Sequence, residues 1–122
     1  MINFEVDEPK RLLVIRYSGT VTPVETEKGL DQIRTGLTRL NSGLRVMVDL
    51  TDLESMDVSC APFVERAMDL CNEKGASAVV RIIPDPHRDI GMSIMSVFHY
   101  RGDTQIFTCE TLAQAEELLR LG

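Results

Sequence analysis

The sequence predicts an α/β fold in which strands and helices alternate after an N-terminal hairpin. Its 122 residues are the length of a single domain. Two strand patterns open the chain, and each later strand pattern is followed by a helical one, in the order ββαβαβαβα. Because this alternation implies right-handed crossovers, we expect a mostly parallel sheet with packed helices and one antiparallel hairpin. Functional groups in such sheets gather at the carboxyl ends of the strands.

The first two elements are predicted to form the hairpin. Apolar and polar residues alternate over residues 2–6, which is the pattern of a strand with one buried face. A turn signal at residues 7–10 separates this strand from the apolar run 12–17. The second strand is expected to end at Ser18-Gly19.

Three signals place the start of the first helix at residue 22. Thr22 can cap the helix, Pro23 suits the first helical position, and Glu25 completes a capping box with Thr22. The turn residues 41–43 are expected to end it. Its predicted buried stripe consists of Leu30, Ile33, Leu37 and Leu40.

Residues 44–83 are predicted to form a strand, a helix and a second strand. Residues 44–50 are the first strand, and a loop is expected over residues 51–59. A helix over residues 60–74 follows and is ended by Gly75. The β-branched run 77–83 is the next strand. The buried face of the helix is predicted to comprise Phe63, Val64, Ala67, Met68 and Cys71.

Two further helices and one strand complete the prediction. A helix begins at Asp85-Pro86 and runs to about Tyr100, and residues 104–109 form the last strand. Thr111 and Gln114 make a capping box for the final helix. That helix is expected to bury Leu112, Ala115, Leu118 and Leu119.

Composition argues against several classes of function. With 13 basic and 19 acidic residues the net charge is -6, which gives little support for nucleic-acid binding. No apolar run approaches the ~20 residues that span a bilayer, and the N-terminus lacks a signal-peptide pattern, so we expect a cytoplasmic protein with no membrane insertion. The three cysteines include no CxxC pair and the two histidines are far apart in sequence, so we predict no metal and no cofactor.

The segment from residue 45 to residue 83 resembles the centre of a STAS domain. This family comprises bacterial anti-sigma factor antagonists (SpoIIAA-like proteins) and the cytosolic tails of sulfate transporters. In it, a strand ending in an acidic residue leads to an Asp-Ser-Ser-Gly-like motif at a helix start. Asp49 and the run Asp57-Val58-Ser59-Cys60 hold those places here. The order of elements from about residue 4 to residue 119 is also similar, which implies one STAS-like domain over residues 1–122.

The resemblance implies a noncatalytic regulatory domain whose partner is an anti-sigma factor or a serine kinase. Ser59 falls on the position that a partner kinase phosphorylates, and the implied partner-binding residues are Asp49, Asp57, Ser59 and Cys60. A phosphate on Ser59 would meet the N–H groups and the positive dipole end of the following helix. Simple N-capping would also account for the serine. Cys60 stands where the family has glycine.

Cys60 and the acidic residues around it allow two other interpretations. A thiol at a helix N-terminus has a lowered pKa, but the preceding loop supplies only carboxylates, so we do not expect an enzyme. The acidic residues lack the spacing of an EF-hand, and a solvated negative surface is favoured over a cation site. The residues concerned are Asp49, Asp52, Glu54 and Asp57.

A second apolar face is predicted on the helix after Pro86. Met92, Met95 and His99 recur there at helical spacing, opposite the face expected to join the core. Methionines in such a position suit either protein association or an apolar ligand. This face therefore indicates a homodimer or a small-molecule site. The alternative function is a STAS-like module that binds a nucleotide or lipid, or self-associates, without a phosphoswitch.

Overall fold

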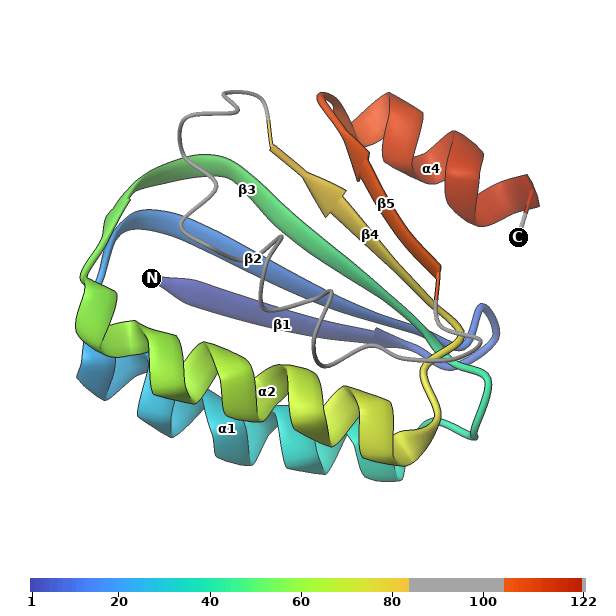
Figure 1. Ribbon diagram of the computed structural model, residues 1–122. Coiled ribbons are helices and arrows are strands. Elements are labelled where there is room, and N and C mark those ends of the chain that lie inside the picture. The colour runs from blue at the N-terminus through green and yellow to red at the C-terminus, as the bar shows by residue number, and fades with distance from the viewer. Residues whose placement is uncertain (84–104, 122) are drawn as a thin grey trace.

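The computed structural model describes residues 1–83 and 105–121, which form a five-stranded sheet with helices on both faces (Figure 1). The strands lie in the order β1-β2-β3-β4-β5. The elements are β1 (Ile2–Asp7), β2 (Leu12–Val21), α1 (Pro23–Thr38), β3 (Arg45–Met56), the 3₁₀ turn η1 (Val58–Cys60), α2 (Ala61–Lys74), β4 (Ala78–Ile82), β5 (Gln105–Cys109) and α4 (Leu112–Leu121).

The topology confirms the α/β class predicted from sequence. β1 pairs with β2 antiparallel, and the pairs β2–β3, β3–β4 and β4–β5 are all parallel. Helices α1 and α2 cover one face of the sheet and α4 covers the other (Figure 1). The helix predicted between Asp85 and Tyr100 lies outside the described residues. Among those that are described, no helix has the length and apolar character needed to cross a bilayer.

Local signals correctly predicted the start of α1, the end of α2 and the start of α4, whereas α1 ends at Thr38, before the predicted turn at residues 41–43. Thr22 Oγ1 accepts the N–H of Glu25 at 3.3 Å, and the Glu25 carboxylate accepts the N–H of Thr22 at 2.8 Å, which is the complete capping box. Gly75 ends α2 in the left-handed conformation. Thr111 and Gln114 exchange the equivalent bonds before α4.

Two strands are longer than predicted. β2 continues past Ser18-Gly19 to Val21, and β3 continues through residues 51–56, which were expected to be a loop. The two extensions pair with each other, and Val21 lies opposite Met56. Asp49 therefore lies within a strand and does not close it.

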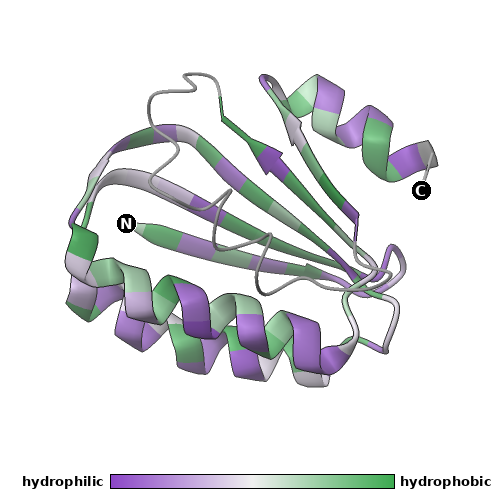
Figure 2. Cartoon of the chain, viewed as in Figure 1, coloured by the Kyte–Doolittle hydropathy of each residue, from purple (hydrophilic) through white to green (hydrophobic). Residues whose placement is uncertain are grey.

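Each face of the sheet buries its own core. The larger core lies under α1 and α2 and includes every member of the stripe predicted for α1, with Leu40 just beyond the helix end. Figure 2 shows apolar and polar residues alternating along the strands and around the helices. The smaller core lies under α4 and contains Leu12, Val14, Met47, Val80, Ile82, Cys109 and Ala115.

One core prediction for α4 was wrong. Ala115 is fully buried and Leu118 and Leu119 are half-buried, but Leu112 is 40% exposed. Leu112 is the first residue of the helix, and its side chain borders a groove beside β1 and β2 instead of joining the core that contains Ala115.

Candidate functional site

Ser59 lies at the end of the sheet where β2 and β3 finish. The turn η1 carries Ser59 and connects β3 to α2. It packs against α1, whose own N-terminus lies at the same end of the molecule (Figure 1). The side chains of Asp57, Val58 and Ser59 are exposed. The Ser59 hydroxyl is therefore accessible to another protein.

Asp57, rather than Ser59, is the capping residue of this turn. One oxygen of its carboxylate, Oδ1, accepts the backbone N–H of Ser59 at 2.8 Å and the Ser59 hydroxyl at 2.5 Å. The hydroxyl bond, followed by the amide bond, lowers the pKa of Asp57. The expected capping role of Ser59 is thus wrong, because Ser59 lies within η1 and donates its hydroxyl to Asp57, and the N-cap residue of α2 is Cys60.

Cys60 holds the turn against the rest of the molecule. Its side chain is fully buried, and its Sγ lies 3.6 Å from the carbonyl oxygen of Val21 at the end of β2. The backbone has φ of -72°, which any L-residue adopts, so a side chain is accommodated where the STAS pattern has glycine. Because the thiol points inward, it cannot supply the surface contact with a partner that the sequence suggested.

Asp49 is not brought to Ser59. It follows Met47 by two residues and so faces the α4 side of the sheet. Its Oδ2 lies 3.6 Å from Nε of Arg16, which also binds Glu5 at 2.6 Å. Seven steps of extended chain, roughly 20 Å, separate Asp49 from the end of β3. The structure therefore gives Asp49 a cross-strand ion pair instead of a place beside the serine.

The acidic residues of β3 do not converge. Asp52 and Glu54 are exposed positions of a strand, whereas Asp57 is engaged with Ser59. Within residues 1–83 and 105–121 no group of three or more His, Cys, Asp or Glu side chains is arranged to hold a metal ion.

Two exposed valines belong to the site and were missed from the sequence. Val58 is 80% exposed and Val24, in the first turn of α1, is 58% exposed. Since η1 packs against α1, both lie at the same end of the molecule. The sequence did contain a signal for Val24, which is an apolar residue outside the buried stripe predicted for its helix. We refer to Val24, Asp57, Val58 and Ser59 as the Ser59 surface.

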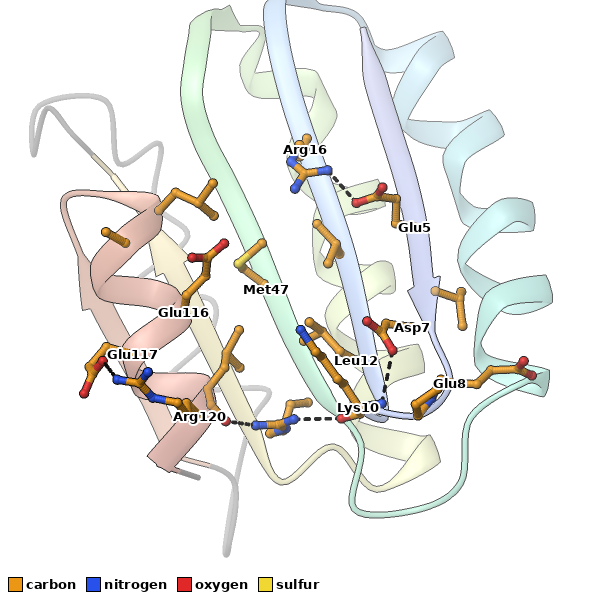
Figure 3. A pocket seen from close by; sticks show the side chains of 17 residues that line it. Glu5, Asp7, Glu8, Lys10, Leu12, Arg16, Met47, Glu116, Glu117 and Arg120 are labelled. Atoms are coloured by element: carbon orange, nitrogen blue, oxygen red, sulfur yellow. Dashed lines mark hydrogen bonds and ion pairs between the residues drawn. The ribbon is translucent and has the colours of Figure 1, made fainter.

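A groove of about 1070 Å³ lies on the face of the sheet that α4 covers, between α4 and strands β1 and β2 (Figure 3). Its floor includes Leu12, Val14 and Met47, which are already buried, so little apolar surface remains for a ligand. Figure 3 shows Glu5 and Arg16 directed toward each other on one side and the Glu117–Arg120 pair on the other. The rim thus carries both signs of charge.

The second apolar face, predicted on the helix after Pro86, stays a prediction. Met92, Met95 and His99 lie outside the described residues, and so do the homodimer contact and the ligand site assigned to them.

Solved structures similar to this chain are anti-sigma factor antagonists and related proteins. The unphosphorylated form of the anti-sigma factor antagonist SpoIIAA matches with a TM-score of 0.67 and 17% identity, over 98% of both chains. The chain has a SpoIIAA-like fold. The phosphorylated form of the Bacillus cell fate determinant SpoIIAA matches with a TM-score of 0.65 and 16% identity, over 98% of this chain and all of that one.

A DUF3478-family protein also shares the SpoIIAA-like fold. This uncharacterized protein from Shewanella loihica matches with a TM-score of 0.71 and 16% identity, over 98% of this chain and 92% of that one. No protein-family model matches the sequence, and no curated protein does. At identities this low, the similarity shows a shared fold and nothing more. The fold expected from the STAS resemblance is therefore confirmed.

Proposed function

We propose that this chain is a noncatalytic regulatory domain that binds a protein partner through the Ser59 surface and is switched by phosphorylation of Ser59. The partner is an anti-sigma factor or a serine kinase, and the setting is the cytoplasm. The observation that carries the proposal is the exposed Ser59 hydroxyl, which stands beside the exposed Val58 just before α2.

The exposed valines support a contact surface at this end of the molecule. Protein interfaces centre on apolar side chains surrounded by polar ones. The described residues include four large hydrophobic side chains that are exposed, and two of them, Val24 and Val58, belong to the Ser59 surface. The polar members are Asp57 and Ser59. This combination suits a protein partner better than a small molecule, because the surface is open.

Phosphorylation would reverse the local electrostatics. The Ser59 hydroxyl now donates to Asp57 Oδ1 at 2.5 Å. A phosphate ester has no hydroxyl proton to donate, and it carries close to two negative charges at neutral pH. An attraction between neighbouring side chains would become a repulsion between a dianion and a carboxylate. A partner that packs on Val58 would meet this charge directly.

The similar solved structures include SpoIIAA in both its unphosphorylated and its phosphorylated form. This likeness supports a phosphorylation switch in this fold, and the Asp57-Val58-Ser59-Cys60 motif is the reason for assigning it to Ser59.

The experiment is affinity purification of the full chain from its native cells, with mass spectrometry of the copurifying proteins and of Ser59. We expect a serine kinase or anti-sigma factor, and a fraction of the chain phosphorylated on Ser59. Ser59→Asp and Val58→Asp should each deplete the partner about tenfold or more, the range of a central interface contact. Ser55→Asp is the matched control, because Ser55 is an exposed serine of β3 that is not part of the Ser59 surface. Unmodified Ser59, together with copurification that neither variant changes, would overturn the proposal.

A further inference from the structure

Along β1, the backbone N–H and C=O groups of successive residues point alternately toward β2 and toward the outer edge of the sheet. β1 is one end of the strand order. Met1 and Ser18 exchange both backbone bonds, Met1 N to Ser18 O at 2.7 Å and Ser18 N to Met1 O at 2.8 Å. In an antiparallel ladder such pairs recur every second residue, so residues 3, 5 and 7 direct their N–H and C=O groups to β2. The corresponding groups of Ile2, Phe4 and Val6 point away from the sheet.

A groove of about 540 Å³ runs along this edge, between β1 and α1. The apolar side chains of β1 that line it are only half-buried. Gly36 lies on the α1 wall, where the absence of a side chain lets the helix approach Val6 closely.

We propose that the β1 edge binds an extended segment of a partner protein, which adds a sixth strand and alternates apolar with basic residues. The backbone of the segment would pair with the outward groups of Ile2, Phe4 and Val6. Its apolar side chains would enter the groove beside Phe4 and Val6, on the α1 side of the sheet. Its basic side chains would fall on the other side of the sheet, next to Glu5 and Asp7.

The acidic side chains of β1 favour basic residues in the partner segment. Side chains alternate between the faces of a strand, so Asn3, Glu5 and Asp7 form the row that an added strand would meet on the α4 side. The Glu5 side chain is 63% exposed even though it pairs with Arg16, which leaves its carboxylate accessible. Opposite charges directly across two strands are favourable, and the net charge of the chain is -6.

The position of α1 disfavours a second copy of this chain as the occupant. A Cβ at Gly29 would lie 3.1 Å from Phe4 Cζ, and one at Gly36 would lie 3.1 Å from Val6 Cγ2, so α1 packs directly on β1. Two β1 strands paired edge to edge would be about 4.8 Å apart. Antiparallel pairing would also place both α1 helices on the same face of the joined sheet, where they would have to fit side by side at the 8–10 Å of packed helices. A lone extended segment brings no such helix.

The test uses the full chain and a fluorescent peptide of alternating valine and lysine, with fluorescence anisotropy as the readout. We expect saturable binding that Glu5→Lys weakens about tenfold, because a favourable cross-strand pair becomes a repulsive one. Glu27→Lys is the matched control, since Glu27 is exposed on α1 outside the groove and the change of net charge is identical. A peptide of alternating valine and glutamate should bind Glu5→Lys better than the wild type.

The backbone geometry is tested separately. Two versions of the peptide, one N-methylated at each valine and one at each lysine, lose opposite sets of N–H donors. Only one set can face β1, so their affinities should differ about tenfold or more. Hydrogen exchange followed by NMR should show that the peptide protects the amides of Ile2, Phe4 and Val6, while those of Asn3 and Glu5 are protected without it.

Three results would overturn the proposal. They are no saturable binding at millimolar peptide, equal affinity of the two N-methylated peptides, and a doubling of mass with protected Ile2, Phe4 and Val6 amides in the peptide-free protein. The last would assign the edge to a second copy. None of these results depends on the Ser59 surface, so this inference and the proposed phosphoswitch can fail independently.

Discussion

Asp57 receives two hydrogen bonds from Ser59 on a single carboxylate oxygen, one from the backbone amide at 2.8 Å and one from the hydroxyl at 2.5 Å. This arrangement ties the exposed serine to the residue that shapes its turn. Any chemistry at the hydroxyl is therefore transmitted to Asp57, and the ionisation of Asp57 reports on the state of Ser59.

Ser59→Ala should raise the pKa of Asp57. The hydroxyl bond is the largest cause of the lowered pKa, and the substitution removes it while keeping the amide bond. Titration of the Asp57 carboxyl carbon by NMR measures the shift directly. Ser55→Ala, which instead removes a hydroxyl bonded to Thr20 at 3.1 Å, should leave the Asp57 titration unchanged.

The same substitution should alter the dependence of stability on pH. A carboxyl whose pKa is lower in the folded than in the unfolded state adds stability above its unfolded pKa, about 3.9 for aspartate, and loses it as pH falls through the folded pKa. Ser59→Ala therefore should reduce the loss of unfolding free energy between pH 7 and acid pH. Urea denaturation at a series of pH values tests this, and identical pH profiles for the two proteins would contradict it.

Native-state thiol chemistry should be slow at all three cysteines. Cys60, Cys71 and Cys109 are free and buried, and burial raises the pKa of the Cys109 thiol. Ellman's reagent should modify the native protein more slowly than free cysteine and should find three thiols after unfolding in denaturant. A single fast thiol that disappears in Cys60→Ala would instead support the reactive-cysteine alternative.

Short-range features of this fold were predictable from sequence, and long-range pairing was not. The Thr22–Glu25 box involves residues three apart, so the local sequence is enough to predict it. The extension of β3 depends on its pairing with the neighbouring strand β2, where Ser18 lies opposite Asp52 and the register shifts twice. Polar residues at positions 51, 52, 54 and 55 made that stretch look like a loop, although Leu53 is buried within it.

The placements expected for Cys60 and Asp49 were wrong for the same reason. Ser59 could be located from its motif, but Cys60 turns inward because its Sγ meets the carbonyl of Val21, a contact across 39 residues. Asp49 was grouped with Ser59 because a loop was assumed between them, and the intervening strand carries it to Arg16 instead. Both errors come from tertiary pairing that a residue pattern does not encode.

Thr22→Ala should destabilise the protein by about 0.5–2 kcal/mol, the usual cost of removing an N-cap side chain. The substitution deletes the bond from the Glu25 amide to Thr22 Oγ1, which is 3.3 Å long. Thr35→Ala is the control: it makes the same chemical change inside α1, where alanine is the better helix former, so stability should stay level or rise. Chemical denaturation of both variants measures the contrast, and equal losses would argue against the cap.

Gly75→Ala should destabilise the protein more than Gly19→Ala. Both glycines have positive φ, +92° for Gly75 and +64° for Gly19, so each substitution carries a left-handed backbone cost of about 1–2 kcal/mol. A Cβ at position 19 meets open space, whereas one at position 75 overlaps Ser42 Oγ. The difference between the two losses in unfolding free energy therefore measures the steric conflict. Ser42→Ala in the Gly75→Ala background removes the clashing oxygen and should restore part of the difference, whereas no restoration would show that backbone conformation alone requires glycine where α2 ends.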